Sequence, residues 1–260
     1  MIKCDLHMHT TFCDGKNTPE EMILSGVEKG LSTIGISGHC NTGFDETYCM
    51  TRPVMEAYYE ELQSLKRKYD GKIKVLCGIE QDYYAGKAYM DFDYVIGSVH
   101  YVCKDGQYLS IDHKKSITVE DVEKYYGGDY YAYAEDYYKL VGDVLNKTDA
   151  DIIGHFDLVT KFNEGYRLFD ESHPRYVKAW KNAVDCLIPY EKPFEINTGA
   201  ISRGYRTSPY PSLPILEYIK EKGGKFILSS DSHSAENICY QFDKWEKYVK
   251  DLSIELIEVI

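Results

Sequence analysis

The sequence predicts an α/β fold in which seven parallel strands close into a barrel. Two observations lead to this prediction. Short apolar segments alternate with helical segments along the whole chain, and no second strand-rich region follows them. The 260 residues are enough to bury a large core, and no Pro/Gly/Ser-rich linker interrupts the alternation. We therefore expect residues 1–260 to form a single domain.

The predicted strands are the apolar stretches 2–6, 33–37, 73–79, 94–98, 151–154, 193–196 and 225–229. Helical segments lie between and after them at 22–29, 53–69, 118–126, 130–145, 172–187, 213–221 and 235–250. The first helix carries its own start signals, because Thr18 suits the N-cap, Pro19 the first turn and Glu21 the capping box. A final segment, 254–260, is expected to add an edge strand.

Charge and composition limit the classes of function that the protein can have. Thirty basic against 42 acidic side chains give a net charge of −12, which opposes nucleic-acid binding and favours a small substrate. The N-terminus lacks the apolar stretch of a signal peptide, and no run approaches the roughly 18 apolar residues that span a bilayer. We expect a cytoplasmic protein that does not enter the membrane. The eight cysteines form no CxxC pair, so neither a zinc ribbon nor a redox dithiol is predicted.

Histidines and carboxylates stand where predicted strands end. In chain order they are His7, His9, His39, Glu80, His100, His155, Asp231 and His233. Six of the eight histidines fall at such positions, although helix and loop positions outnumber them several-fold. Because the chemistry of parallel α/β folds gathers at the carboxyl ends of strands, we interpret the pattern as a metal site. The other two, His113 and His173, are expected at the surface.

The ligand types indicate which metals would bind. Imidazole and carboxylate groups without thiolate suit zinc, manganese or iron, whereas an all-oxygen magnesium or calcium site is disfavoured. The number of candidate ligands exceeds what one ion can use, so we expect two or three divalent transition-metal ions. Polynuclear sites of this kind generate a nucleophilic hydroxide and hold the oxygens of a phosphoryl group during its displacement.

Six short segments resemble, in order, the motifs of the polymerase and histidinol phosphatase (PHP) family. They are Asp5-Leu6-His7-Met8-His9-Thr10, Gly38-His39, Gly78-Ile79-Glu80, Gly97-Ser98-Val99-His100, Gly154-His155 and Ser230-Asp231-Ser232-His233. The resemblance covers nearly the whole chain, and the chain length is similar to that of the stand-alone histidinol-phosphate phosphatases of the family.

The resemblance implies a distorted (β/α)7 barrel, similar to a TIM barrel, with a trinuclear metal centre. One ion would be held by His7, His9, Glu80 and Asp231. Glu80 would bridge to a second ion held by His100 and His155, and Asp14, His39 and His233 would hold the third. Some members of the family place a histidine where this chain has Asp14, and a carboxylate there is still a competent ligand.

The implied activity is that of a phosphomonoesterase that converts L-histidinol phosphate to L-histidinol and phosphate in histidine biosynthesis. Asp231 and His233 are expected to take part in catalysis, and either a metal-bound water or a ligand such as His233 would protonate the leaving alkoxide. Arginines should complete the neutralisation of the phosphate, because a guanidinium matches its geometry. Arg167 and Arg203, on loops after the fifth and sixth strands, are the candidates, and Arg206 is a weaker third.

Three alternatives remain open from the sequence. Other members of the family act on nucleotides or nucleic acid, although the charge of −12 argues against a polymeric substrate. A protein-tyrosine phosphatase on the same scaffold would use the same chemistry at the metals. A non-catalytic metal-binding module is disfavoured because all nine ligand positions are filled. The sequence does not indicate which residues recognise the rest of the substrate, or the oligomeric state.

Overall fold

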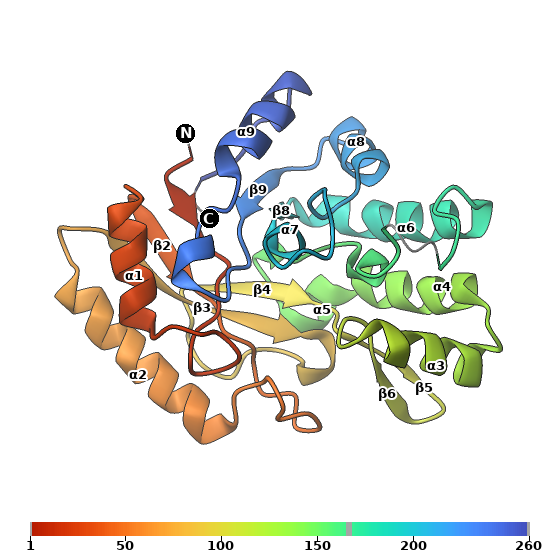
Figure 1. Ribbon diagram of the computed structural model, residues 1–260, viewed down its shortest axis with the longest axis horizontal. Coiled ribbons are helices and arrows are strands. Elements are labelled where there is room, and N and C mark those ends of the chain that lie inside the picture. Colours follow the sequence, from red (N-terminus) through yellow and green to blue (C-terminus); the bar gives the residue numbers. More distant parts are fainter. Residues whose placement is uncertain (1, 165–167, 259–260) are drawn as a thin grey trace.

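A nearly closed barrel of seven parallel strands forms the centre of the protein (Figure 1). The computed structural model describes residues 2–164 and 168–258. The strands follow one another around the sheet in chain order: β1 Cys4–Asp5, β2 Thr33–Ile36, β3 Lys74–Asp82, β4 Tyr94–Ser98, β7 Ile152–Ile153, β8 Phe194–Asn197 and β9 Phe226–Ser229. Past the last strand, the His9 amide donates to the Ser232 carbonyl at 2.8 Å, which joins the two edges of the sheet at its carboxyl end. The predicted barrel is confirmed.

The helices cover the outside of the strands. Their bounds are α1 Pro19–Glu28, α2 Arg52–Lys68, α3 Lys115–Tyr126, α4 Tyr130–Val141, α5 Val144–Thr148, α6 Pro174–Leu187, α7 Gly199–Ser202, α8 Leu213–Glu221 and α9 Phe242–Asp251. Figure 1 shows α1 and α2 on one flank and α4 and α6 on the other. The start of α1 is the predicted capping box, since the Thr18 side chain accepts from the Glu21 amide and the Glu21 carboxylate accepts from the Thr18 amide.

One antiparallel hairpin was not predicted. Strands β5 Tyr101–Lys104 and β6 Gln107–Ser110 pair directly after β4, across a two-residue turn of Asp105 and Gly106. Both turn residues have positive φ, 51° and 76°, as the mirror-image hairpin turns require. The Asp-Gly signal was therefore present in the sequence, between two short strands that the alternation of strands and helices did not include.

The predicted boundaries fail at three other places. The helix expected at 130–145 is divided at Gly142 and Asp143 into α4 and α5. The helix expected at 235–250 begins only at Phe242, because Cys239 and Gln241 both adopt φ of 56°, which a helix cannot contain. Within the described part of segment 254–260, Leu256 makes a single parallel bridge to Phe226 in place of a strand.

A single tyrosine fills much of the barrel interior. Tyr94 is 2% exposed and packs with Leu6 and Ile96, and its hydroxyl donates to the Leu6 carbonyl at 2.5 Å. A Cβ added to Gly35 or Gly78 would overlap the Tyr94 phenol ring or its hydroxyl. The barrel therefore requires glycine on both β2 and β3, because only glycine leaves room for the ring.

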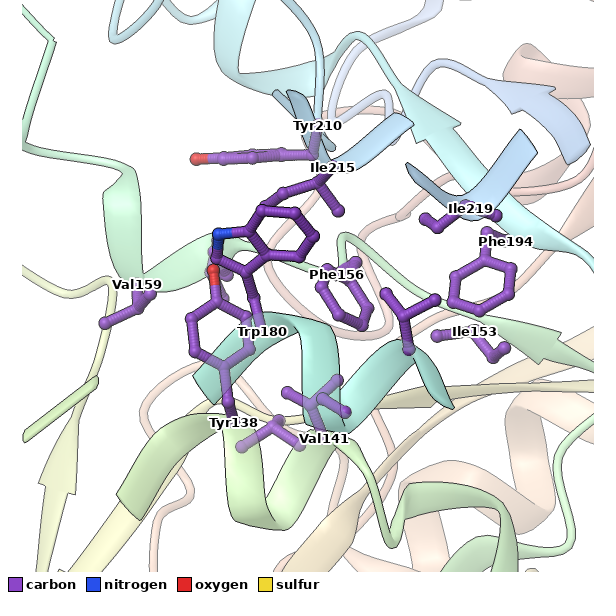
Figure 2. Close-up of a cluster of buried hydrophobic side chains, with 14 of the residues drawn as sticks. Tyr138, Val141, Ile153, Phe156, Val159, Trp180, Phe194, Tyr210, Ile215 and Ile219 are labelled. Carbon is purple, nitrogen blue, oxygen red and sulfur yellow. The ribbon is translucent and has the colours of Figure 1, made fainter. Parts of the chain in front are cut away.

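A second core binds the helices of one flank to the barrel (Figure 2). Tyr138 and Val141 of α4 and Trp180 of α6 pack towards Phe194, which begins β8, and Phe156, which follows β7. All of these side chains are less than 8% exposed. Such close packing keeps the carboxyl ends of β7 and β8 in fixed positions relative to the other strands. Within the described residues, no helix combines the length and the apolar character needed to cross a membrane.

Candidate metal centre

The side chains predicted from the strand ends lie together at the carboxyl end of the barrel, with the Glu80 carboxylate at their centre. Glu80 belongs to β3, and five imidazoles come from the segments that follow four other strands, β1, β2, β4 and β7. Three are close to Oε2: His39 Nδ1 at 2.8 Å, His7 Nε2 at 3.4 Å and His9 Nε2 at 3.6 Å. Two are close to Oε1: His155 Nε2 at 2.9 Å and His100 Nε2 at 3.3 Å.

The ligand atoms form three overlapping groups, each compact enough to hold a metal ion. The groups are His7, His9 and Glu80; His39, Glu80 and His100; and His9, Asp14, His39 and His233, with the atoms of each within 4.8 Å of one another. Asp231 adds a further carboxylate oxygen, which lies 3.3 Å from His9 Nε2 and 3.9 Å from His7 Nε2. The arrangement can therefore hold more than one ion.

Unpaired buried atoms support this interpretation. His7 Nε2 and His9 Nε2 are inaccessible to solvent and have no hydrogen-bond partner within the described residues. Buried polar atoms are normally paired, so two that face the same carboxylate without partners are expected where a ligand completes them. Imidazole nitrogen with carboxylate oxygen is a donor set that suits a divalent transition metal.

The electrostatics keep the carboxylates ionised. Burial raises the pKa of Glu80, but the imidazoles of His7, His39 and His100 outweigh it and hold that pKa well below its usual range. Burial likewise opposes the ionisation of Asp231, where Arg203 and His7 hold the pKa well below normal. At neutral pH both groups are anions, the form in which a carboxylate binds a metal.

His9 shows the opposite effect. Burial lowers the pKa of its imidazole to about 3, helped by the nearby His233 and His39. The ring is therefore neutral at physiological pH and keeps a lone pair for a metal. The neighbouring Cys13 thiol lies 3.6 Å from His9 Nδ1, and burial raises its pKa to about 12, so that it remains protonated and is no thiolate ligand.

Two buried carboxylates that the sequence analysis missed orient the imidazoles from behind. Glu195 Oε1 lies 2.5 Å from His7 Nδ1, and Asp82 Oδ2 lies 3.2 Å from His100 Nδ1. A carboxylate on one ring nitrogen fixes the tautomer and leaves the other nitrogen free for a metal. A signal existed for both: Glu195 is the acidic residue within the apolar strand β8, and Asp82 stands two residues after Glu80 on the same face of β3.

Arg203 reaches the site from α7. Its Nη2 lies 2.9 Å from Asp231 Oδ2 and its Nη1 lies 2.7 Å from His233 Nδ1. Asp231 has a φ of 46°, a strained conformation for a residue with a side chain. Gly199 permits this arrangement, since a Cβ there would lie 2.7 Å from Asp231 Oδ2.

The remaining candidates lie elsewhere or cannot be placed. Arg167 lies outside the described residues. Arg206 is buried against the Tyr210 ring and bonds Thr160 and Ser208, so its described contacts are with residues other than the predicted ligands. His113 is exposed. His173 is partly buried and caps α6, where its Nδ1 accepts from the Arg175 amide.

The barrel and its buried histidine and carboxylate cluster define a metal-dependent phosphoesterase. A family model described as the PHP domain matches residues 5–199. The chain belongs to the PHP family.

Two named relatives match almost the full length of the chain. A Deinococcus radiodurans protein named "Probable histidinol-phosphatase" is 28% identical over 263 residues, which cover 96% of this chain and 93% of that protein. The Bacillus subtilis protein named "Histidinol-phosphatase" is 26% identical, and the match covers 94% of this chain and 98% of that one.

Two crystal structures share the fold. A Listeria monocytogenes protein superposes with a TM-score of 0.79 at 22% identity and covers 93% of this chain and 99% of its own. The histidinol phosphate phosphatase of Lactococcus lactis, complexed with zinc, L-histidinol and phosphate, superposes with a TM-score of 0.73 at 21% identity. That match covers 99% of this chain and 96% of the other.

Proposed function

We propose that this protein is a phosphomonoesterase that hydrolyses L-histidinol phosphate to L-histidinol and phosphate, a step of histidine biosynthesis. The observation that carries the phosphatase activity is the convergence of five imidazoles from four strand ends on the Glu80 carboxylate. The names of the full-length relatives support the substrate. We further propose that residues 1–260 form one domain.

Nine side chains are proposed to hold two or three zinc, manganese or iron ions. His7, His9, Glu80 and Asp231 hold the first; Glu80, His100 and His155 hold the second; and Asp14, His39 and His233 hold the third. The distances favour Glu80 as the bridge, because its Oε2 faces His7 and His9 while its Oε1 faces His100 and His155. The third group is supported by Asp14, whose oxygens lie 3.2 Å from His233 Nε2 and 3.7 Å from His39 Nε2.

Bound metals would supply a hydroxide nucleophile at neutral pH and neutralise the phosphate oxygens. Side chains of the protein are proposed to bind the phosphate and to assist the leaving group. The Arg203 guanidinium, 26% exposed, is placed beside the cluster to bind phosphate oxygens. The proton for the leaving alkoxide would come from a metal-bound water or from a ligand such as His233, which is 20% exposed. Arg167 is a second proposed phosphate ligand.

The proposal is tested by purifying the protein with its native metals and measuring kcat/KM on a panel of substrates. The panel contains L-histidinol phosphate, a phosphotyrosine peptide, a cyclic dinucleotide and single-stranded DNA. We expect L-histidinol phosphate to be preferred by at least about 100-fold, a difference of about 2.7 kcal/mol in transition-state binding. Turnover of DNA without turnover of L-histidinol phosphate would overturn the proposed substrate.

A further inference from the structure

A buried lysine and a half-buried aspartate lie beside the metal centre on the side of His100 and His155. Asp112 follows Ile111, whose amide donates to the His100 carbonyl at 2.8 Å. Lys161 lies six residues after His155 and reaches across to Asp112. Its Nζ donates to the Asp112 carbonyl at 2.7 Å and to Asp112 Oδ2 at 3.1 Å.

The two partners differ in exposure. The Lys161 side chain is 10% exposed, whereas that of Asp112 is 31% exposed. Lys161 therefore directs its charge inward to Asp112 and fixes the position of the carboxylate, while part of that carboxylate remains open to solvent. An anchored and accessible carboxylate is suited to receive a cation from solution, because little side-chain freedom is lost on binding.

The Asp112 carboxylate interacts electrostatically with residues of the proposed metal centre. Burial opposes the ionisation of Asp112, but the charge of Lys161 and then those of His100 and His155 outweigh it and lower its pKa to about 2. The Arg203 guanidinium is near enough for its charge to act on the same carboxylate. Asp112 is thus an anion at neutral pH, one residue beyond Ile111, which is hydrogen-bonded to His100.

The Lys161 ammonium that binds this carboxylate also contacts an aromatic ring. Tyr205, two residues after Arg203, is 43% exposed, and Lys161 Nζ lies 4.7 Å from its ring centre. Phe162 supports it edge-on at 5.8 Å. An anion near a partly exposed aromatic ring matches a leaving group that carries both an ammonium and a flat ring.

We propose that Asp112 is a specificity-determining residue that binds the ammonium group of the substrate, that Lys161 positions it, and that Tyr205 forms the wall beside the heteroaromatic ring. This inference rests on the proposed phosphatase function and identifies residues that select its substrate. It applies to any phosphate monoester whose alcohol carries a nearby amine.

The test compares Asp112→Asn with the wild type on two esters that differ only in the amine: L-histidinol phosphate and 3-(imidazol-4-yl)propyl phosphate. The asparagine keeps the shape and an acceptor for Lys161 but removes the charge. We expect the ratio of kcat/KM for the two esters to fall about tenfold, the value of one hydrogen bond between charged groups. Glu120→Gln, which removes an exposed charge from α3, should leave the ratio at the wild-type value. An unchanged ratio in Asp112→Asn, at wild-type metal content, overturns the proposal.

Lys161 is tested by the same ratio. Lys161→Met should lower it as Asp112→Asn does, because the carboxylate loses its anchor, and Lys161→Arg should restore most of it. A merely structural role would lower kcat/KM for both esters together and leave the ratio unchanged.

The failure of the proposed function can be distinguished from the failure of this inference. A wild-type protein that hydrolyses other phosphomonoesters but not L-histidinol phosphate refutes the proposed substrate. The role of Asp112 is then tested by comparing kcat/KM for phosphoethanolamine with kcat/KM for ethyl phosphate, in the wild type and in Asp112→Asn. A preference for the amine ester that Asp112→Asn abolishes supports the inference, and a wild type without that preference overturns it.

Discussion

Replacement of Glu195 by glutamine should weaken metal binding while leaving the protein folded. The Glu195 carboxylate accepts from four donors: Oε1 from His7 Nδ1 and Ser229 Oγ, both at 2.5 Å, and Oε2 from the His155 amide at 2.8 Å and Asn197 Nδ2 at 2.9 Å. The His155 amide can only donate. Asn197 cannot easily turn its amide around, because its Oδ1 accepts from the Gly199 amide at 2.8 Å.

The glutamine must therefore place its oxygen at the Oε2 position and its NH₂ group towards His7 and Ser229. The Ser229 hydroxyl can rotate to accept, but His7 can accept only by moving its proton from Nδ1 to Nε2. Nε2 is the unpaired atom that faces Glu80 and Asp231. A proton there removes the lone pair that a metal would use, although the fold loses few hydrogen bonds.

We expect Glu195→Gln to weaken binding of one metal ion by 10- to 100-fold, or about 1.4–2.8 kcal/mol. Metal content is measured by mass spectrometry after dialysis against a series of buffered metal concentrations, with thermal unfolding of the metal-free proteins as the measure of folding. Glu21→Gln, the same change at the α1 capping box, is the control and should bind metal as the wild type does. Metal affinity within twofold of the wild type in Glu195→Gln would refute the tautomer argument.

Four further outcomes are expected. Removing metal with a chelator should abolish hydrolysis and lower Tm, because ions present at 1,000 times their Kd add about 4 kcal/mol of stability. Added zinc or manganese should restore both the activity and the Tm. A Tm that the chelator leaves unchanged would contradict a bound metal. His100→Ala should abolish activity and leave the far-ultraviolet circular dichroism unchanged, whereas near-wild-type turnover with full metal content would remove His100 from the site. Arg203→Ala should raise KM for a phosphomonoester about tenfold, and an unchanged kcat/KM would exclude a phosphate contact. Gly78→Ala should destabilise the fold by about 1–3 kcal/mol in urea unfolding, because its methyl group meets the Tyr94 ring; unchanged stability would show that the ring can move.

The predicted fold and the main cluster followed from local pattern alone. Six of the seven predicted strands coincide closely with observed strands, and the first, 2–6, contains the short β1. The alternation of apolar and helical segments is a local property of the sequence. Because parallel strands end at one edge of the sheet, this local pattern also predicts that side chains far apart in the chain meet there. The structure brings together His7, His9, His39, Glu80, His100, His155, Asp231 and His233, as that rule expects, and it places Asp14, which only the family resemblance had suggested, among them.

Other features could not be obtained from local pattern. The break before α9 depends on two residues in the left-handed region, Cys239 and Gln241, neither of which carries a glycine-like signal. Arg206, proposed from its loop position as a possible phosphate ligand, packs over the Tyr210 ring and bonds Thr160. In both cases the competing conformations differ by contacts that only the assembled chain supplies.

The sequence by itself determined that parallel strands would gather histidines and carboxylates at one end, because the apolar strand pattern and the ligand residue types are both local properties of the chain. Only the tertiary structure decided which groups surround them: Glu195 behind His7, Asp82 behind His100, and Lys161 holding Asp112 at the mouth. These partners lie up to 188 positions apart. Their meeting depends on barrel register and on the packing of side chains such as Tyr94, and no short segment of the chain encodes either.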